Sequence, residues 1–130
     1  MTRDIIATDK APGAVGPYSQ AVRTDGLVFT AGQIPLDPAT GSLVDGDIED
    51  QTRRVLDNLA AVLEAAGSGL AEVLKMTVFM TDLGDFQRMN AVYAEYFPSS
   101  PPARSAFQVA ALPLGAAIEM EAVALTRNGS

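Results

Sequence analysis

The sequence predicts an α+β fold in which a single β-sheet carries two helices on one face. Three observations support this class: a strand-turn-strand pattern around Asp25-Gly26, two stretches with apolar residues at helical spacing, and β-rich segments between and after them. The predicted order of elements is β-β-β-α-β-α-β-β. A chain of 130 residues suits one domain, here residues 1–130.

The first three strands are predicted in the N-terminal quarter of the chain. Residues 5–7 form a short apolar run, and residues 20–24 and 27–33 flank Asp25-Gly26, a pair that favours positive φ and therefore a two-residue hairpin turn. The third strand ends in Ala31-Gly32-Gln33, where a glycine lets the backbone approach a neighbour closely. A β-bulge is the commoner explanation for a glycine in this position.

The two helices are predicted from apolar spacing and from their ends. The first is expected to begin after Asp47 as N-cap and to end at Gly67. Asp82, with Asp85 three residues later, is typical of the start of a second helix, which ends before Pro98. Residues 73–80 between them are β-rich and mostly apolar, which indicates a central strand.

Residues 101–107 and 118–123 are predicted to be the last two strands and to pair with each other. Because side chains alternate across a strand, Arg104 should lie on the face opposite its two neighbours, while Glu119 and Glu121 should share one face. Two helices can cover only one face of the sheet. We therefore expect a second subunit to bury the other face in a homo-oligomer.

Arg104 allows two interpretations. Its guanidinium keeps its charge at any ordinary pH, so among strand residues it must meet a carboxylate, carbonyl groups or an anionic ligand. The strand pattern alone favours an internal ion pair between Arg104 and either Glu119 or Glu121. The alternative is an anion-binding site with an acid beside it.

Composition excludes several classes of function. The chain has no cysteine and no histidine, so thiol chemistry and imidazole catalysis are ruled out. The net charge is −7 and no basic run exceeds Arg53-Arg54, which disfavours nucleic-acid binding. The first residues lack the apolar run of a secretory signal and no stretch has the length of a membrane span. We therefore expect a cytoplasmic protein that binds no membrane.

Several segments, in order along nearly the whole chain, match the pattern of one known family: Gly16-Pro17-Tyr18-Ser19-Gln20-Ala21, Ala31-Gly32-Gln33-Ile34-Pro35, 51–67, Thr77-Val78-Phe79, Asp82-Leu83, Pro102-Ala103-Arg104-Ser105, Val109-Ala110 with Leu112-Pro113, and 118–124. Through them the chain resembles the RidA (YjgF) family of reactive-intermediate deaminases. The resemblance implies a chorismate-mutase-like fold with one mixed six-stranded sheet, and a homotrimer with active sites in the clefts between subunits.

The resemblance also implies an activity. The family hydrolyses 2-imino acids and their enamine tautomers, such as 2-iminobutanoate, 2-iminopropanoate and 2-aminoacrylate, to 2-keto acids and ammonia. These intermediates are released by pyridoxal-phosphate enzymes, which the family protects. It needs neither a cofactor nor a metal, and its partners are the small substrate and further copies of the chain.

The site residues carried over from the family follow its motifs. Arg104 would grip the substrate carboxylate, Glu119 would orient the attacking water, and the Gly32 N–H would help to hold the carboxylate. The remaining pocket-lining positions are Tyr18, Ala31, Asn90 and Ala106. Ala31 and Ala106 stand where many members have serine and cysteine.

Two other functions remain open from the sequence. A trimer that binds small carboxylates or a protein partner without turnover is favoured by Ala31 and Ala106, which remove polar groups from the pocket. Ribonuclease or translation-inhibitor activity has been attributed to relatives, and the acidic charge and the lack of histidine argue against it here.

Overall fold

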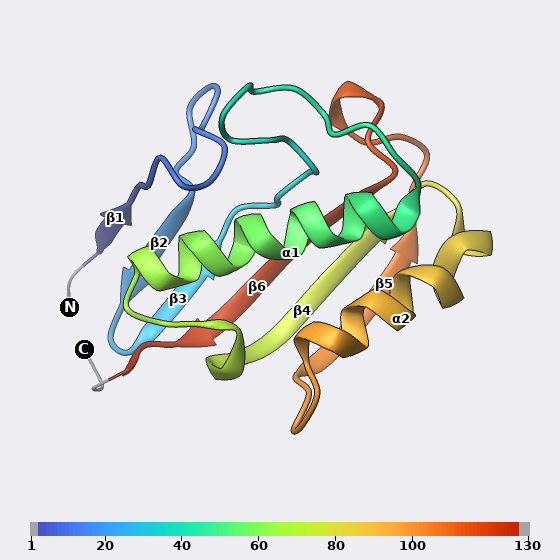
Figure 1. Ribbon diagram of the computed structural model, residues 1–130. Coiled ribbons are helices and arrows are strands. Elements are labelled where there is room, and N and C mark those ends of the chain that lie inside the picture. The colour runs from blue at the N-terminus through green and yellow to red at the C-terminus, as the bar shows by residue number, and fades with distance from the viewer. Residues whose placement is uncertain (1–2, 128–130) are drawn as a thin grey trace.

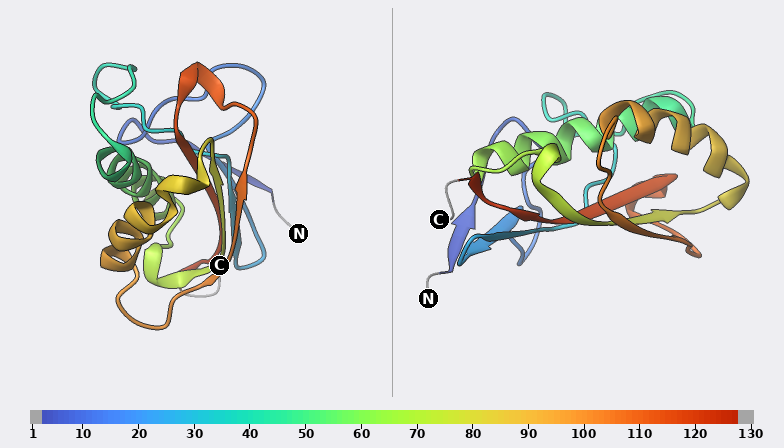
Figure 2. Two further views of the ribbon diagram at one scale, coloured as in Figure 1. Left: turned by 90° about the vertical axis from the view of Figure 1, so that its right-hand side faces the viewer. Right: turned by 90° about the horizontal axis from the view of Figure 1, so that it is seen from below.

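The computed structural model describes residues 3–127 as one six-stranded sheet with both helices on one face (Figures 1 and 2). The elements are β1 Asp4–Ile6, β2 Ala21–Thr24, β3 Leu27–Thr30, α1 Ile48–Ala65, β4 Val73–Met80, α2 Phe86–Tyr96, β5 Ala103–Gln108 and β6 Ile118–Leu125. The strand order is β1-β2-β3-β6-β4-β5, with β4 and β5 parallel and every other pair antiparallel. The predicted α+β class, element order and mixed sheet are confirmed.

The local turn and capping signals act as predicted. Asp25 and Gly26 have φ values of 45° and 83°, as a two-residue hairpin turn requires. The Asp47 side chain accepts a hydrogen bond from the Asp50 N–H at 3.1 Å, and the Asp50 carboxylate accepts one from the Asp47 N–H at 3.3 Å. This reciprocal capping box begins α1, and Gly67, with φ 78°, follows the helix end.

The predicted pairing of residues 101–107 with residues 118–123 is wrong, because β4 lies between these strands and pairs with both. A parallel pair needs a long crossover connection, which α2 provides between β4 and β5. The loop from β5 to β6 then passes over the end of β4 (Figure 1). As a result β5, which carries Arg104, is an edge strand.

The start of α2 also differs from the expectation. Asp82 caps a short 3₁₀ turn at Leu83–Asp85, where its side chain accepts a hydrogen bond from the Gly84 N–H at 2.8 Å. The α-helix itself begins only at Phe86. Similarly, β3 ends at Thr30, and Gln33 makes an isolated bridge to Met120 of β6.

The core lies between the sheet and the two helices. Alternate residues of β4 and β6 face the helices and are fully buried, together with the apolar stripe of α1. The largest fully buried side chains are Leu56, Leu59, Leu63, Met76, Met80, Met89, Ile118 and Met120. The opposite sheet face is open in a single chain, and Phe29, Phe107 and Leu125 on it are each about half exposed.

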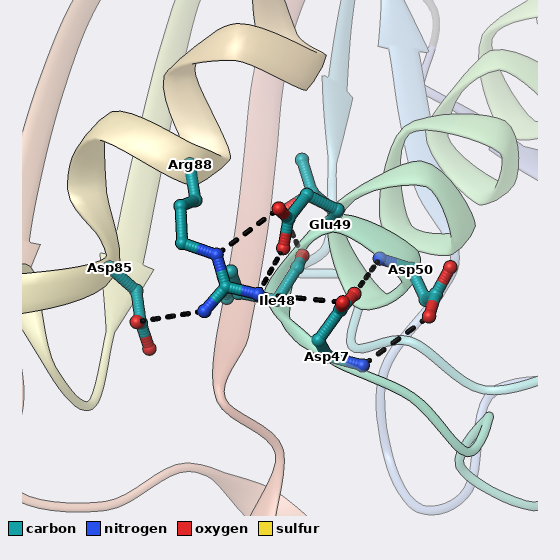
Figure 3. Close-up of polar contacts among 7 residues, drawn as sticks. Asp47, Ile48, Glu49, Asp50, Asp85 and Arg88 are labelled. Atoms are coloured by element: carbon teal, nitrogen blue, oxygen red, sulfur yellow. Dashed lines mark hydrogen bonds and ion pairs between the residues drawn. The ribbon is translucent and has the colours of Figure 1, made fainter.

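An ionic network holds α2 against the beginning of α1. Figure 3 shows Arg88 reaching from α2 toward Asp47 and Glu49, with Asp85 beside it. The guanidinium lies 2.6 Å from one Glu49 carboxylate oxygen and donates from Nε to the other at 3.1 Å. Such a bidentate contact fixes orientation better than a single ion pair does. Within residues 3–127 no helix has the length and apolar character needed to span a bilayer.

Asn58 attaches the segment after β3 to α1. Its side chain is fully buried, donates to the carbonyls of Leu36 at 2.9 Å and Ile34 at 3.4 Å, and accepts from Arg54 Nε at 3.1 Å. These bonds satisfy backbone acceptors that have left the sheet. Asn58 therefore positions the chain that follows Gly32.

We expect Asn58→Ala to lower the free energy of unfolding by about 1–3 kcal/mol, because it leaves buried carbonyls without donors. Urea unfolding at one fixed protein concentration measures this change. Glu64→Ala, at an exposed position of the same helix, is the control and should change little. Equal urea midpoints for the two variants would show that Asn58 does not hold this segment.

Candidate active site

A pocket at one end of the sheet contains Glu119, the first of the two predicted catalytic residues. Three loops, residues 7–20, 31–47 and 109–117, gather at this end (Figure 1). Tyr18, Ala31 and Gly32 line the pocket together with Glu119, in a cavity of about 530 Å³. Three of the predicted pocket-lining residues are therefore brought together with the predicted acid.

Gly32 allows the Glu119 carboxylate to lie directly over the backbone. A Cβ atom added at Gly32 would lie 2.8 Å from Cδ and 3.1 Å from Cγ of Glu119 and would collide with the carboxylate oxygen. The carboxylate lies this close because glycine has no Cβ, and any other residue at this position would force the Glu119 side chain to shift; the φ of Gly32 is not in the left-handed region. The bulge interpretation is unnecessary, since β3 has already ended.

Partial burial raises the pKa of Glu119, and the neighbouring Glu121 carboxylate raises it further. Both glutamates lie on the open face of β6, since Ile118 and Met120 between and beside them are buried against the helices. A carboxylate with a raised pKa is a better proton acceptor than an ordinary one once it is ionised. Glu119 is therefore suited to take a proton from water.

Arg104 lies on the other face of the sheet. It is level with the buried Met76 in the parallel pair, so its side chain points toward α2. Nη1 donates to Asn90 Oδ1 at 2.7 Å, and Cζ lies 5.2 Å and 4.6 Å from the ring centroids of Phe86 and Tyr93. The guanidinium is thus held by a neutral amide and two aromatic rings.

Arg104 has no acid partner within the chain. In residues 3–127 no carboxylate lies within ion-pair distance of it. Tyr93 does not neutralise it, because burial raises the pKa of this hydroxyl although Arg104 partly opposes the shift. The predicted internal ion pair with Glu119 or Glu121 is wrong, because these residues lie on the opposite face of the sheet.

The two predicted catalytic residues are not adjacent within one chain. Glu119 is level with Phe79, three positions along β4 from Met76, and β4 separates the two strands. Three residues along a strand and two strand spacings each correspond to about 10 Å. Arg104 lines a separate cavity of about 380 Å³ with Asn90 and Tyr93. Within one chain, Glu119 and Arg104 therefore lie in two separate cavities.

Ala106 lines neither cavity. It is level with Val78 on the helix-facing side and packs against the core, so it offers no polar group to either cavity.

Four residues that contact Arg104 or line the Glu119 pocket were not identified from the sequence. Phe86 and Tyr93 belong to the apolar spacing of the second predicted helix, yet they contact Arg104. Val15 and Leu114 line the Glu119 pocket. The sequence feature that could have identified Val15 and Leu114 is a large aliphatic residue within a predicted loop.

Among residues 3–127, no three His, Cys, Asp or Glu side chains are grouped in a way that could hold a metal ion. The groups available for chemistry are therefore a carboxylate over a glycine backbone and a guanidinium with free hydrogen-bonding capacity. The first can orient water, and the second can bind a small carboxylate.

Comparison with known proteins places this arrangement in a family. The family model described as Endoribonuclease L-PSP matches residues 8–126. A RutC family protein of Pyrococcus abyssi is 53% identical over 124 residues, which span 95% of this chain and 98% of that protein. The human protein named 2-iminobutanoate/2-iminopropanoate deaminase is 48% identical over 125 residues, 96% of this chain and 91% of that protein.

The fold comparison agrees with the sequence comparison. The crystal structure of a protein from Thermotoga maritima, titled a putative endoribonuclease, superposes with a TM-score of 0.94 at 52% identity and covers 98% of this chain and 100% of that one. Because the family model and the relatives extend over nearly the whole sequence, the chain belongs to the Endoribonuclease L-PSP family, the RidA (YjgF) family that its motifs resemble.

Proposed function

We propose that this protein hydrolyses 2-imino acids and their enamine tautomers, such as 2-iminobutanoate, 2-iminopropanoate and 2-aminoacrylate, to 2-keto acids and ammonia. One observation carries the proposal: Arg104 presents a guanidinium with no carboxylate partner among residues 3–127. The similarity to a human protein named as a deaminase of these imines supports it. In this role the protein would protect pyridoxal-phosphate enzymes in the cytoplasm.

In this proposal a homotrimer brings the Glu119 pocket of one subunit and the Arg104 cavity of another together into one site. The open sheet face, with Phe29 and Phe107 half exposed, is covered by a neighbouring subunit. The edge strand β5 of one subunit then brings Arg104 to the Glu119 pocket of the next. This arrangement overcomes the separation of the two residues within each chain.

The reaction follows from the groups on each side of such a cleft. Arg104 binds the substrate carboxylate through paired N–H donors, and the Gly32 N–H, which donates to no other described residue, adds a further donor. Glu119 accepts a proton from water as the water oxygen bonds to the iminium carbon. That proton then passes from Glu119 to the nitrogen. As the C–N bond breaks and ammonia leaves, the hydroxyl group on the same carbon gives its remaining proton to Glu119 and becomes the carbonyl oxygen of the keto acid.

No covalent nucleophile is needed, because an iminium carbon is already electrophilic. A positioned base contributes typically about 10²–10⁴-fold to such a step. The absence of a hydroxyl at Ala31 removes one polar contact and leaves Arg104, Gly32 and Glu119 in place. A non-catalytic carboxylate-binding trimer is the alternative, and turnover distinguishes the two.

The direct test generates imines in situ from L-alanine or L-2-aminobutyrate with an amino-acid oxidase, in the presence of semicarbazide. The protein should compete with semicarbazide for the imine and accelerate keto-acid release. Calorimetric binding of 2-oxobutanoate without any such competition would identify a binding module. RNA cleavage that survives Arg104→Ala would instead favour a ribonuclease.

We expect Arg104→Lys to lower kcat/KM by roughly 10–100-fold, since a charge-assisted hydrogen bond contributes about 1.5–3 kcal/mol and lysine cannot present two parallel donors. The imine competition assay measures this loss, with circular dichroism to show that the fold persists. Arg53→Lys, at an exposed ion pair with Glu95, is the matched control and should retain activity. Full activity of Arg104→Lys would remove the carboxylate-binding role.

We expect Arg104→Ala and Glu119→Gln to be inactive alone and to restore activity when mixed. Random assembly of the two variants into trimers would make roughly a quarter of the shared sites intact, if each site takes its arginine and its glutamate from different subunits. The assay is repeated after the two are refolded together, with sedimentation to confirm trimers. No recovery in verified mixed trimers would place both residues in one subunit's site.

We expect Glu121→Gln to shift the acidic limb of the kcat/KM profile to lower pH. Activity requires ionised Glu119, whose raised pKa makes activity fall as pH decreases through that pKa; removing the Glu121 charge lowers the pKa and extends activity downward. A pH–rate profile of both proteins measures the shift. An unmoved limb would show that Glu119 does not control it.

A further inference from the structure

Lys75 is a second cation without an acid partner. It lies on the open face of β4, because its neighbour Met76 points to the helices and is fully buried. Its Nζ donates to Ser105 Oγ of β5 at 2.8 Å, and within residues 3–127 no carboxylate lies within ion-pair distance of it. A neutral hydroxyl therefore holds this ammonium group, as a neutral amide holds Arg104.

Glu121 is an unpaired acid on the same face of the sheet. It lies on β6, directly opposite Thr77 of β4. Among the described residues it makes no hydrogen bond and no ion pair, and its charged neighbour is another acid, Glu119. The open face thus carries a cation and an anion, and neither charge is neutralised within the chain.

The Lys75 side chain extends away from Glu121. Lys75 is opposite Val123 and Glu121 is opposite Thr77, so the two charged residues are diagonal neighbours on adjacent strands. Such positions lie about 7–8 Å apart, within reach of a lysine side chain. Lys75 nevertheless extends to the other side, to Ser105 of β5. Its ammonium group is therefore directed toward the edge strand that also carries Arg104.

The homotrimer of the proposed function covers this face and removes water from both charges. A charge that loses its water without gaining a partner strongly opposes association. Neither Lys75 nor Glu121 has such a partner in its own chain, so each needs the opposite charge from a neighbouring subunit. A contact between the β5 edge of one subunit and β6 of the next would supply both.

We propose that Lys75 of one subunit and Glu121 of the next form an ion pair at each interface of the trimer. This inference rests on the homotrimer in the proposed function and adds the charges by which one copy of the chain recognises another. Arg104 is level with Met76, next to Lys75, and Glu121 is two residues from Glu119 on β6. The contact that brings Arg104 to the Glu119 pocket therefore also brings Lys75 toward Glu121.

The test reverses each charge and follows assembly by sedimentation over a range of protein concentrations. Lys75→Glu and Glu121→Lys each place like charges at every interface. We therefore expect each to raise the concentration at which trimers form by at least about tenfold. The double variant, which carries both reversals, restores opposite charges and should form trimers as the wild-type protein does.

A mixture of the two single variants distinguishes a pair between subunits from a pair within one chain. In a mixed cyclic trimer two of the three interfaces join opposite charges, while positions 75 and 121 of each chain still carry the same charge. After the variants are refolded together, we expect trimers at concentrations where neither variant alone forms them. Recovery in the double variant but not in the mixture would place the pair within one chain and overturn the proposal.

Arg53→Glu and Glu95→Lys are the matched controls, because they reverse an exposed ion pair between the two helices, which cover the other face of the sheet. Both should form trimers at the wild-type concentration. Circular dichroism shows whether each single variant folds, and trimers in the refolded mixture decide the test if one does not.

Two further results would overturn the ion pair. If Lys75→Glu and Glu121→Lys form trimers as readily as the controls, the pair is absent, and imine hydrolysis, which is measured separately, leaves the deaminase function intact. If the wild-type protein forms no trimers, the ion pair and the shared active site are both overturned.

Discussion

The proposed function depends on the position of the Arg104 guanidinium, which has no carboxylate partner within residues 3–127. Arg104 cannot lose its proton, and within the described chain its contacts are the Asn90 amide and the rings of Phe86 and Tyr93. These contacts fix the orientation of the side chain and leave its charge uncompensated. A carboxylate partner would have made Arg104 a structural residue. Every element that positions α2, including the Arg88 network, therefore also positions Arg104.

The sheet divides the chemistry between two faces. Glu119 lies on the open face, where partial burial and Glu121 raise its pKa, and Arg104 lies on the face covered by the helices. A substrate that needs both groups cannot be served by one chain, so assembly and catalysis become linked in the proposed function. The open face would then bury apolar surface and complete the site in the same step.

The proposed reaction requires few residue types in the pocket. Gly32 has no side chain, so the Glu119 carboxylate can lie over its backbone, and a larger residue there would displace the carboxylate. Ala31 and Ala106 supply no polar group, and hydrolysis of an imine needs none beyond a base, water and a carboxylate anchor.

The elements themselves were determined by the sequence, because turn, capping and apolar-spacing preferences act within a few residues. The hairpin at Asp25-Gly26 and the start of α1 after Asp47 are examples. The sequence also established that Arg104 needs an anionic or polar partner. Which strands pair depends on contacts between segments far apart along the chain, and no local pattern encodes them. Only the tertiary structure therefore decided that β4 lies between β5 and β6, which separates Arg104 from Glu119 and excludes their ion pair.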